Sequence, residues 1–147
     1  MLDVILPPLT HLTKLSIVGS NSFSSGCLYL RSLEGLQACG QLKNLDISYA
    51  DVTSLRPLSS CRHLSCLNID SCAALSSLSP LTACVELEHL SMRGCDKMMS
   101  VAPLRACTRL EVLYMDSFKK KAPPALEALK AAMPKLRVDH NSPFPWR

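Results

Sequence analysis

Residues 64–72 read LSCLNIDSC, and the spacing of the apolar residues in this stretch decides the fold. Leu64, Leu67 and Ile69 follow the pattern L-x-x-L-x-[LIMV], and a small residue, Cys72, comes three positions later. Because Leu67 and Ile69 alternate with other residues, the pattern predicts a short strand with one apolar face. Such a strand is not stable alone, so its recurrence along the chain is decisive.

The pattern recurs at a nearly constant period. Its clear copies begin at Leu12, Leu42, Leu64, Leu87 and Leu110, with offsets of 30, 22, 23 and 23 residues. A weaker sixth copy is expected 23 residues later, with Met133 and Leu136 in the places of Leu110 and Leu113. Copies in phase predict parallel strands about 4.8 Å apart, stacked so that their leucines form one continuous core.

A second pattern follows each of the first four strands. Three copies end in Pro-Leu-x-x-Cys: VTSLRPLSSC (52–61), LSSLSPLTAC (75–84) and MMSVAPLRAC (98–107). The first copy, LRSLEGLQAC (30–39), has Gly35 where the others have proline. These segments are punctuated by proline and poor in helix formers, which predicts turns or short 3₁₀ helices on the convex side.

Together the two patterns resemble the leucine-rich repeat family, in the 22- to 23-residue form of internalins and phosphatase-regulatory repeat proteins. The cysteine-rich version is also similar to leucine-rich repeat proteins of protozoa. The resemblance covers nearly the whole chain. It implies an α/β fold: a right-handed solenoid or horseshoe with about six parallel strands on the concave face, an irregular or 3₁₀ convex side and a C-terminal capping helix.

The chain is therefore expected to form three consecutive parts. Residues 1–118 hold repeats 1 to 5, with an insertion at 21–29. Residues 119–141 form a cap made of a helix and the sixth repeat strand, and residues 142–147 form an extended tail.

The cap helix and the tail are identified by their composition. The helix is expected in ALEALKAAM (125–133), where Leu126, Leu129 and Met133 share a face. In the tail we expect Phe144 and Trp146 to fold back over the last repeat, with presentation to a partner as the alternative.

Most of the cysteines fall in two columns of the repeat. Four of them lie three residues before the first leucine of a strand: Cys39, Cys61, Cys84 and Cys107. Cys72 and Cys95 lie where the family usually has asparagine, and a thiol there can replace the asparagine against the turn backbone. Both columns should point inward as small buried residues. Parallel columns do not converge on one point, so we expect free thiols, no metal and no cofactor.

Eight cysteines without disulfides are typical of a reducing intracellular compartment. The cytoplasm is the preferred location, with the nucleus and the mitochondrial matrix as alternatives. No run of eighteen apolar residues is present, so we expect no membrane insertion.

The side chains between the inward leucines should form the concave surface. The predicted partner-binding residues there are Asp46, Tyr49, Asn68, Asp70, His89, Arg93, Tyr114, Asp116 and Arg137. Asp70, Arg93 and Asp116 alternate in sign on successive repeats. They form either cross-strand ion pairs or a charged recognition strip with Tyr114 as an aromatic anchor.

Cys66 and His89 should be neighbours on adjacent strands, and a Cys-His pair can activate a thiolate. An open solenoid face offers no evident oxyanion hole, and the sequence has no phosphate-binding glycine loop or serine elbow. We therefore expect a polar binding face, ordinary reactivity of Cys66, no enzymatic activity and no small-molecule substrate.

The two ends of the repeat array suggest further contacts. Leu2, Val4, Ile5 and Leu6 leave the amino-terminal edge apolar. These residues either complete a half-repeat or dock onto another subunit or further repeats, and we expect the isolated protein to self-associate through this edge. Residues 119–147 carry 7 of the 16 basic residues and only 2 of the 12 acidic ones. Lys119, Lys120 and Lys121 form a basic run that could contact RNA.

The sequence thus predicts a non-catalytic protein-interaction or scaffold subunit of a larger intracellular assembly. Its partners would bind the concave sheet and the amino-terminal edge. The alternative is a ribonucleoprotein component whose basic C-terminal region contacts RNA.

Overall fold

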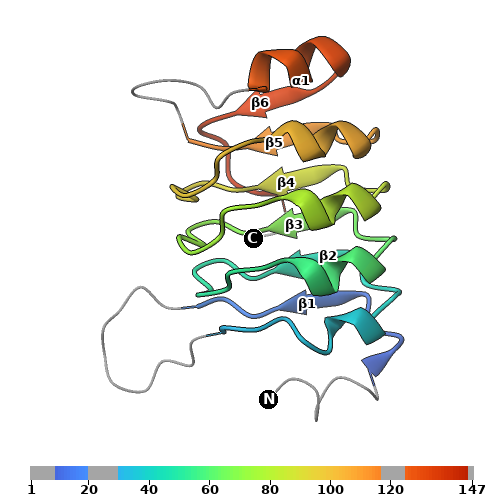
Figure 1. The fold of residues 1–147 in the computed structure, drawn as a ribbon. Coiled ribbons are helices and arrows are strands. Elements are labelled where there is room, and N and C mark those ends of the chain that lie inside the picture. The colour runs from blue at the N-terminus through green and yellow to red at the C-terminus, as the bar shows by residue number, and fades with distance from the viewer. Residues whose placement is uncertain (1–8, 20–29, 117–124, 146–147) are drawn as a thin grey trace.

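The repeats coil into a solenoid in the computed structural model, which describes residues 9–19, 30–116 and 125–145. Within these ranges six strands form one parallel sheet in the order β1-β2-β3-β4-β5-β6, so each strand pairs with the next one along the chain (Figure 1). The strands are β1 (Lys14–Ser16), β2 (Asn44–Asp46), β3 (Cys66–Asn68), β4 (His89–Ser91), β5 (Val112–Tyr114) and β6 (Arg137–Asp139). The predicted fold class, an α/β solenoid, is confirmed.

The return segments lie on the opposite side of the coil from the sheet (Figure 1). They are the 3₁₀ helices η3 (Leu36–Ala38), η4 (Arg56–Ser60), η5 (Ser79–Ala83) and η6 (Ala102–Ala106), followed by the α-helix α1 (Leu126–Ala132). The 3₁₀ helices η4, η5 and η6 have proline in their first turn, where its missing N–H costs no hydrogen bond. Each of these helices closes with an N–H of cysteine donated to a leucine carbonyl, as from Cys61 to Leu58.

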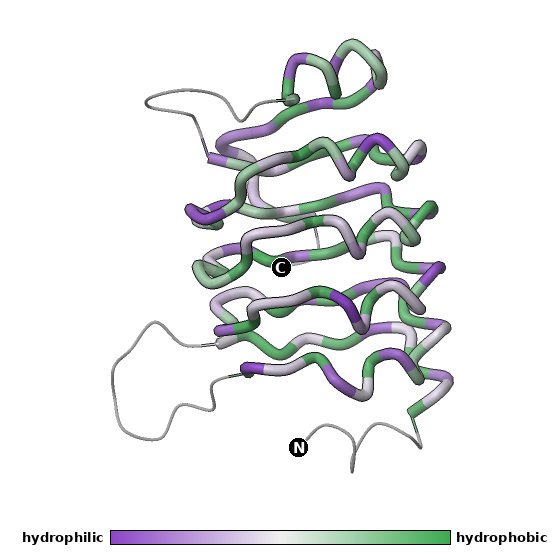
Figure 2. Tube along the Cα trace, in the orientation of Figure 1, coloured by the Kyte–Doolittle hydropathy of each residue, from purple (hydrophilic) through white to green (hydrophobic). Residues whose placement is uncertain are grey.

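The core lies between the sheet and the return segments. The inward leucines of the strands, such as Leu45, Leu67 and Leu90, are fully buried, and so are Leu58 and Leu81 of the return segments. Figure 2 shows the same hydrophobic positions recurring on successive turns of the coil. At the carboxyl end α1 buries Leu126 and Leu129 against this core, and Met133 packs on it, which confirms the predicted capping helix.

The sixth strand is paired differently from the prediction. Leu113 was matched with Leu136, but it pairs with Val138, so the last turn uses two residues more than the 23 of the turns before it. The physical reason is α1: an α-helix rises about 1.5 Å per residue and a 3₁₀ helix about 2.0 Å, so the helical return needs more residues for the same length. Asp139 therefore lies beside Tyr114, and Arg137 beside Val112.

The turns after β2, β3 and β4 share a left-handed residue. Tyr49, Ser71 and Gly94 have φ of 62°, 58° and 67°. A Cβ added to Gly94 would also lie 3.0 Å from the Ser71 hydroxyl oxygen. Glycine at this position therefore avoids both the conformational cost and the close contact.

We predict that Gly94→Ala lowers the free energy of unfolding by about 1 kcal/mol or more, because alanine pays the left-handed penalty and crowds Ser71. Urea unfolding measures the change. Gly40→Ala is the matched control, since a Cβ on Gly40 meets nothing within 4 Å. Equal stabilities of the two variants would contradict the prediction.

Candidate protein-binding surface

The central column of the concave face is a set of polar and aromatic residues that are largely buried. Paired across the strands, it consists of Ser16, Asp46, Asn68, Ser91, Tyr114 and Asp139. The four from Asp46 to Tyr114 are each less than 5% exposed. Asp46, Asn68 and Tyr114 were predicted as recognition residues, but their side chains are not freely accessible.

Several of these side chains close the turn that ends their own strand. Asp46 Oδ1 accepts the Ser48 N–H at 3.0 Å, and Asn68 Oδ1 accepts the Asp70 N–H at 3.0 Å. Asp and Asn favour such turns because their short side chains reach the backbone two residues on. Sequence reasoning missed this contribution, although an Asp or Asn at the last position of the strand was a usable signal.

The predicted strip of alternating charge is held by backbone contacts. Asp70 Oδ1 accepts the Ser91 hydroxyl at 2.6 Å and the Arg93 N–H at 2.8 Å. Asp116 Oδ2 accepts the Gly94 N–H at 2.6 Å. Each carboxylate therefore binds the turn of the preceding or following repeat, and the Arg93 guanidinium is directed elsewhere.

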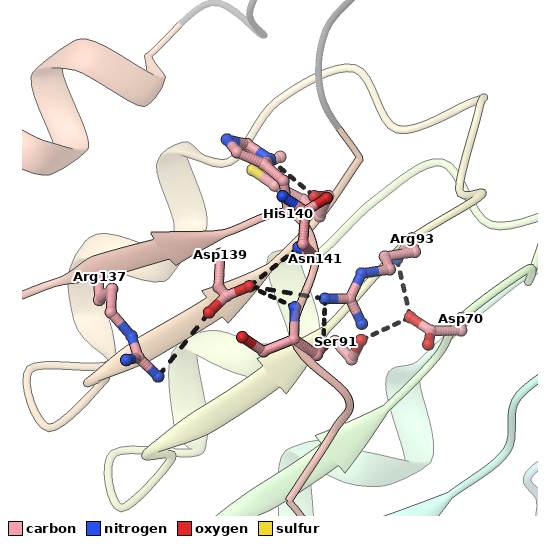
Figure 3. Close-up of polar contacts among 9 residues, drawn as sticks. Asp70, Ser91, Arg93, Arg137, Asp139, His140 and Asn141 are labelled. Atoms are coloured by element: carbon pink, nitrogen blue, oxygen red, sulfur yellow. Dashed lines mark hydrogen bonds and ion pairs between the residues drawn. The ribbon is translucent and has the colours of Figure 1, made fainter.

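Arg93 reaches the carboxyl-terminal segment (Figure 3). Its Nη2 donates to the Ser142 carbonyl oxygen at 2.7 Å and lies 4.0 Å from Asp139 Oδ1. The guanidinium carbon lies 5.2 Å from the centre of the Tyr114 ring, within range of a cation–π interaction. Arg93 and Tyr114, both predicted binding residues, are thus brought together. Both already contact the carboxyl-terminal part of the same chain.

Residues 140–145 form the tail segment, which follows β6. His140 Nδ1 is 2.9 Å from the Met115 carbonyl oxygen. The Phe144 ring is 3% exposed and packs edge-on against Tyr114, with centroids 5.3 Å apart and an interplanar angle of 78°. Val112 and Cys66 complete the cluster. Phe144 folds back as predicted, but it packs on β5 and β3 and not over the last repeat. Trp146 lies outside the described residues.

Asp139 fixes the start of the tail segment. Its Oδ1 accepts the N–H of Ser142 at 2.8 Å and of Asn141 at 3.0 Å (Figure 3). These backbone donors, with smaller help from Arg137, lower the pKa of Asp139 to about 2.

The other predicted binding residues differ in accessibility. Tyr49 and His89 are half-buried, and Asp116 and Arg137 are exposed. Three buried atoms on this side of the sheet have no hydrogen-bond partner among the described residues: Ser48 Oγ, Asn68 Nδ2 and His89 Nδ1.

Cys66 and His89 are neighbours across β3 and β4, as predicted. A catalytic Cys-His pair needs a third group that orients the imidazole, and no described residue bonds His89 Nδ1. The described residues also hold no cluster of three or more histidine, cysteine or acidic side chains that could bind a metal ion.

Several predicted features fall in parts of the chain that the structure does not describe. The insertion at 21–29, the amino-terminal Leu2, Val4, Ile5 and Leu6, and the basic Lys119, Lys120 and Lys121 lie outside the described residues. Near the basic run, Lys130 pairs with Glu127 at 3.2 Å. Within the described ranges we find no helix with the length and apolar character needed to cross a membrane.

Comparisons with known proteins agree with this architecture. No family model and no curated protein matches the sequence. The functional domain of InlJ from Listeria monocytogenes superposes with a TM-score of 0.53 at 17% identity, over 92% of this chain and 35% of that one. This chain has the leucine-rich repeat fold.

Two further solved internalins are similar at lower scores. The internalin InlF from L. monocytogenes gives a TM-score of 0.43 at 17% identity, over 89% of this chain and 48% of that one. Internalin C2 from the same species gives 0.43 at 16% identity, over 88% and 71%. The present leucine-rich repeat chain thus spans about a third of InlJ and about half of InlF.

The InlJ domain is described as including a cysteine ladder. In the present leucine-rich repeat chain the cysteines form two inward stacks, as predicted. The four-cysteine stack is Cys39, Cys61, Cys84 and Cys107, and the two-cysteine stack is Cys72 and Cys95. All six are at most 7% exposed, and all six are free thiols.

Five of the six stacked thiols, all but Cys39, are seen to donate to a backbone carbonyl of the preceding repeat. In the two-cysteine stack Cys72 Sγ lies 3.3 Å from the Ile47 oxygen and Cys95 Sγ lies 3.1 Å from the Ile69 oxygen. This confirms that the thiol replaces asparagine against the turn backbone. In the four-cysteine stack the equivalent contact, as from Cys84 to Leu58 at 3.5 Å, was not predicted.

Burial also makes these thiols hard to ionise. It raises the pKa of Cys61, Cys72 and Cys107 to about 11, and of Cys84 and Cys95 to about 12. A thiolate is the reactive form, so these side chains are structural and not nucleophilic.

We predict that stability falls as the pH rises from about 9 toward 12, because unfolded thiols lose their protons near 8.5 and the buried ones only at higher pH. Cys84→Ala should reduce the slope by at most about 1.4 kcal/mol per pH unit. Urea unfolding between pH 8 and 11 measures this. Val85→Ala, at an exposed side chain, is the control, and a slope for Cys84→Ala equal to that of the control would disprove the prediction.

We predict that Asp139→Ala releases the tail segment, because the N–H groups of Asn141 and Ser142 lose their acceptor. Hydrogen exchange at these two amides should become faster, and Asp139→Asn, which keeps an acceptor oxygen, should have a smaller effect. In the unmodified chain the lowered pKa means that the contact is complete above about pH 4 and is lost as the pH falls toward 2. Exchange that is unchanged in Asp139→Ala would refute this.

Proposed function

We propose that this protein is a non-catalytic protein-interaction subunit that scaffolds a larger intracellular assembly, and that its partner binds the concave sheet. One observation carries the proposal: Ser48 Oγ, Asn68 Nδ2 and His89 Nδ1 are buried on that side of the sheet without a hydrogen-bond partner among the described residues. A buried polar atom without a partner typically costs about 1–3 kcal/mol. Since these atoms have almost no exposed surface, a partner chain recovers this free energy only where its binding moves the side chains that cover them.

The neighbouring residues suit protein recognition. Arg93 and Tyr114 are side chains enriched at the centres of interfaces, and they lie together beside the unpaired atoms of β3 and β4. A solenoid presents its strands as one continuous concave surface, so contacts from several repeats can add. The six stacked cysteines are free and buried, which supports a reducing compartment.

The fold supplies a platform but names no partner, because the same repeat architecture serves many functions. In the described part of the basic region, Lys130 and Arg137 already pair with Glu127 and Asp139, which does not favour the RNA-binding alternative.

The test is site-specific photo-cross-linking in cells. We expect cross-linkers placed at Tyr49 or His89, on the concave face, to give discrete protein adducts, because these half-buried positions border the unpaired atoms. Cross-linkers at Ser59 and Arg105, exposed on the return segments, should give none of the same adducts.

Adducts obtained equally from the convex positions would refute binding through the concave sheet. Adducts with RNA, with an affinity that falls steeply as salt rises, would favour the ribonucleoprotein alternative and refute the protein-interaction proposal.

A further inference from the structure

We propose that the concave face of β3 to β5 is a binding site for an extended peptide that carries an aromatic residue flanked by prolines. In the absence of a partner, residues 142–145 of the chain itself occupy this site, and a partner peptide competes with them. The inference rests on the proposed function and specifies the chemical class of its partner.

The Phe144 side chain anchors residues 142–145 on the sheet. Phe144 lies between Pro143 and Pro145, and it is buried whereas both prolines and Ser142 are exposed. Its ring meets the edge of Tyr114 at 5.3 Å and packs with Val112 and Cys66. The site therefore selects an aromatic ring and is indifferent to the side chains beside it.

The second contact is to the backbone and does not depend on sequence. Arg93 Nη2 donates to the carbonyl of Ser142, two residues before the ring. Arg93 is held for this contact by the Tyr114 ring and by Asp139. Any extended peptide with a carbonyl at the same distance from an aromatic residue can accept this hydrogen bond.

Proline on both sides of the ring lowers the cost of binding. It restricts φ to about −65°, so the free peptide is already extended and loses less entropy when it docks. The motif Ser-Pro-Phe-Pro at 142–145 is restricted by its prolines in this way. Its position on the sheet shows which peptide geometry the site accepts.

Within the described residues, few contacts hold the tail segment, so a partner can displace it. Beyond Asp139 and His140, those contacts include the Phe144 ring and the Ser142 carbonyl. A partner that supplies the same ring and carbonyl can make the same two contacts. The tail's advantage is its tether, equivalent to a millimolar local concentration.

The experiment uses Cys66 as a reporter, because it packs against the Phe144 cluster. The rate of its modification by a thiol reagent is followed by mass spectrometry in the full-length chain, in Phe144→Ala and in Arg93→Ala. The probe is the synthetic peptide HNSPFPWR, the sequence of residues 140–147. The control probe is the same peptide with alanine in place of phenylalanine.

We expect Phe144→Ala to raise the Cys66 rate about tenfold, because modification follows the population in which the site is open. Arg93→Ala should raise it less. Millimolar HNSPFPWR should return the rate of Phe144→Ala to that of the unmodified chain, and the alanine peptide should not. The unmodified chain should respond to neither peptide, and Met99→Ala, an exposed position outside the cluster, should behave like it.

An unchanged rate in both Phe144→Ala and Arg93→Ala would overturn the tail as occupant, and equal protection by the two peptides would overturn aromatic selectivity. If these results failed while the cross-links from Tyr49 and His89 persisted, the peptide class would be wrong and the concave interface would stand. Peptide protection without any concave cross-links would instead refute the proposed cellular interaction.

Discussion

Backbone hydrogen bonding between successive turns is the interaction on which this structure depends. Each strand is three residues long and cannot exist without its neighbours. The residue after the strand donates its N–H to the next turn in every repeat, as from Ile17 to Asp46 at 2.8 Å, Ile47 to Asn68 at 3.0 Å and Ile69 to Ser91 at 2.8 Å. Because the bonding repeats, equivalent side chains are stacked at the strand spacing, and the stacks determine the rest of the chemistry.

The stacks explain why residue type alone misleads about function. The cysteines lie in columns that suggest a metal or redox site, yet their thiols donate to carbonyls of the preceding turn and their pKa values are raised by burial. Asp46 and Asn68 lie on a candidate recognition face, yet they bind the backbone of their own turns. In both cases the repeat geometry uses a chemically versatile group to satisfy the backbone.

The concave face combines structural residues with a small region of different character. This region brings together the Arg93 cation, the rings of Tyr114 and Phe144, and a main-chain carbonyl. Most neighbouring polar side chains instead hydrogen-bond the backbone of the turns. This region depends on a contact between residues 49 positions apart, Arg93 and Ser142. A solenoid otherwise contacts mainly its sequence neighbours, so this long-range contact is unusual for the architecture.

The sequence by itself determined the period, the inward leucines and cysteines and the 3₁₀ returns, because each is local and is repeated along the chain. It also determined the capping helix, because the apolar spacing of that helix is local. One copy of the leucine pattern is weak evidence, but several copies in phase predict the fold. Only the tertiary structure decided the pairing of Leu113 with Val138 and the position at which Phe144 packs on the sheet. The pairing of Leu113 depends on the rise per residue of α1, and the position of Phe144 depends on one contact that no other repeat makes. A repeat period contains neither kind of information.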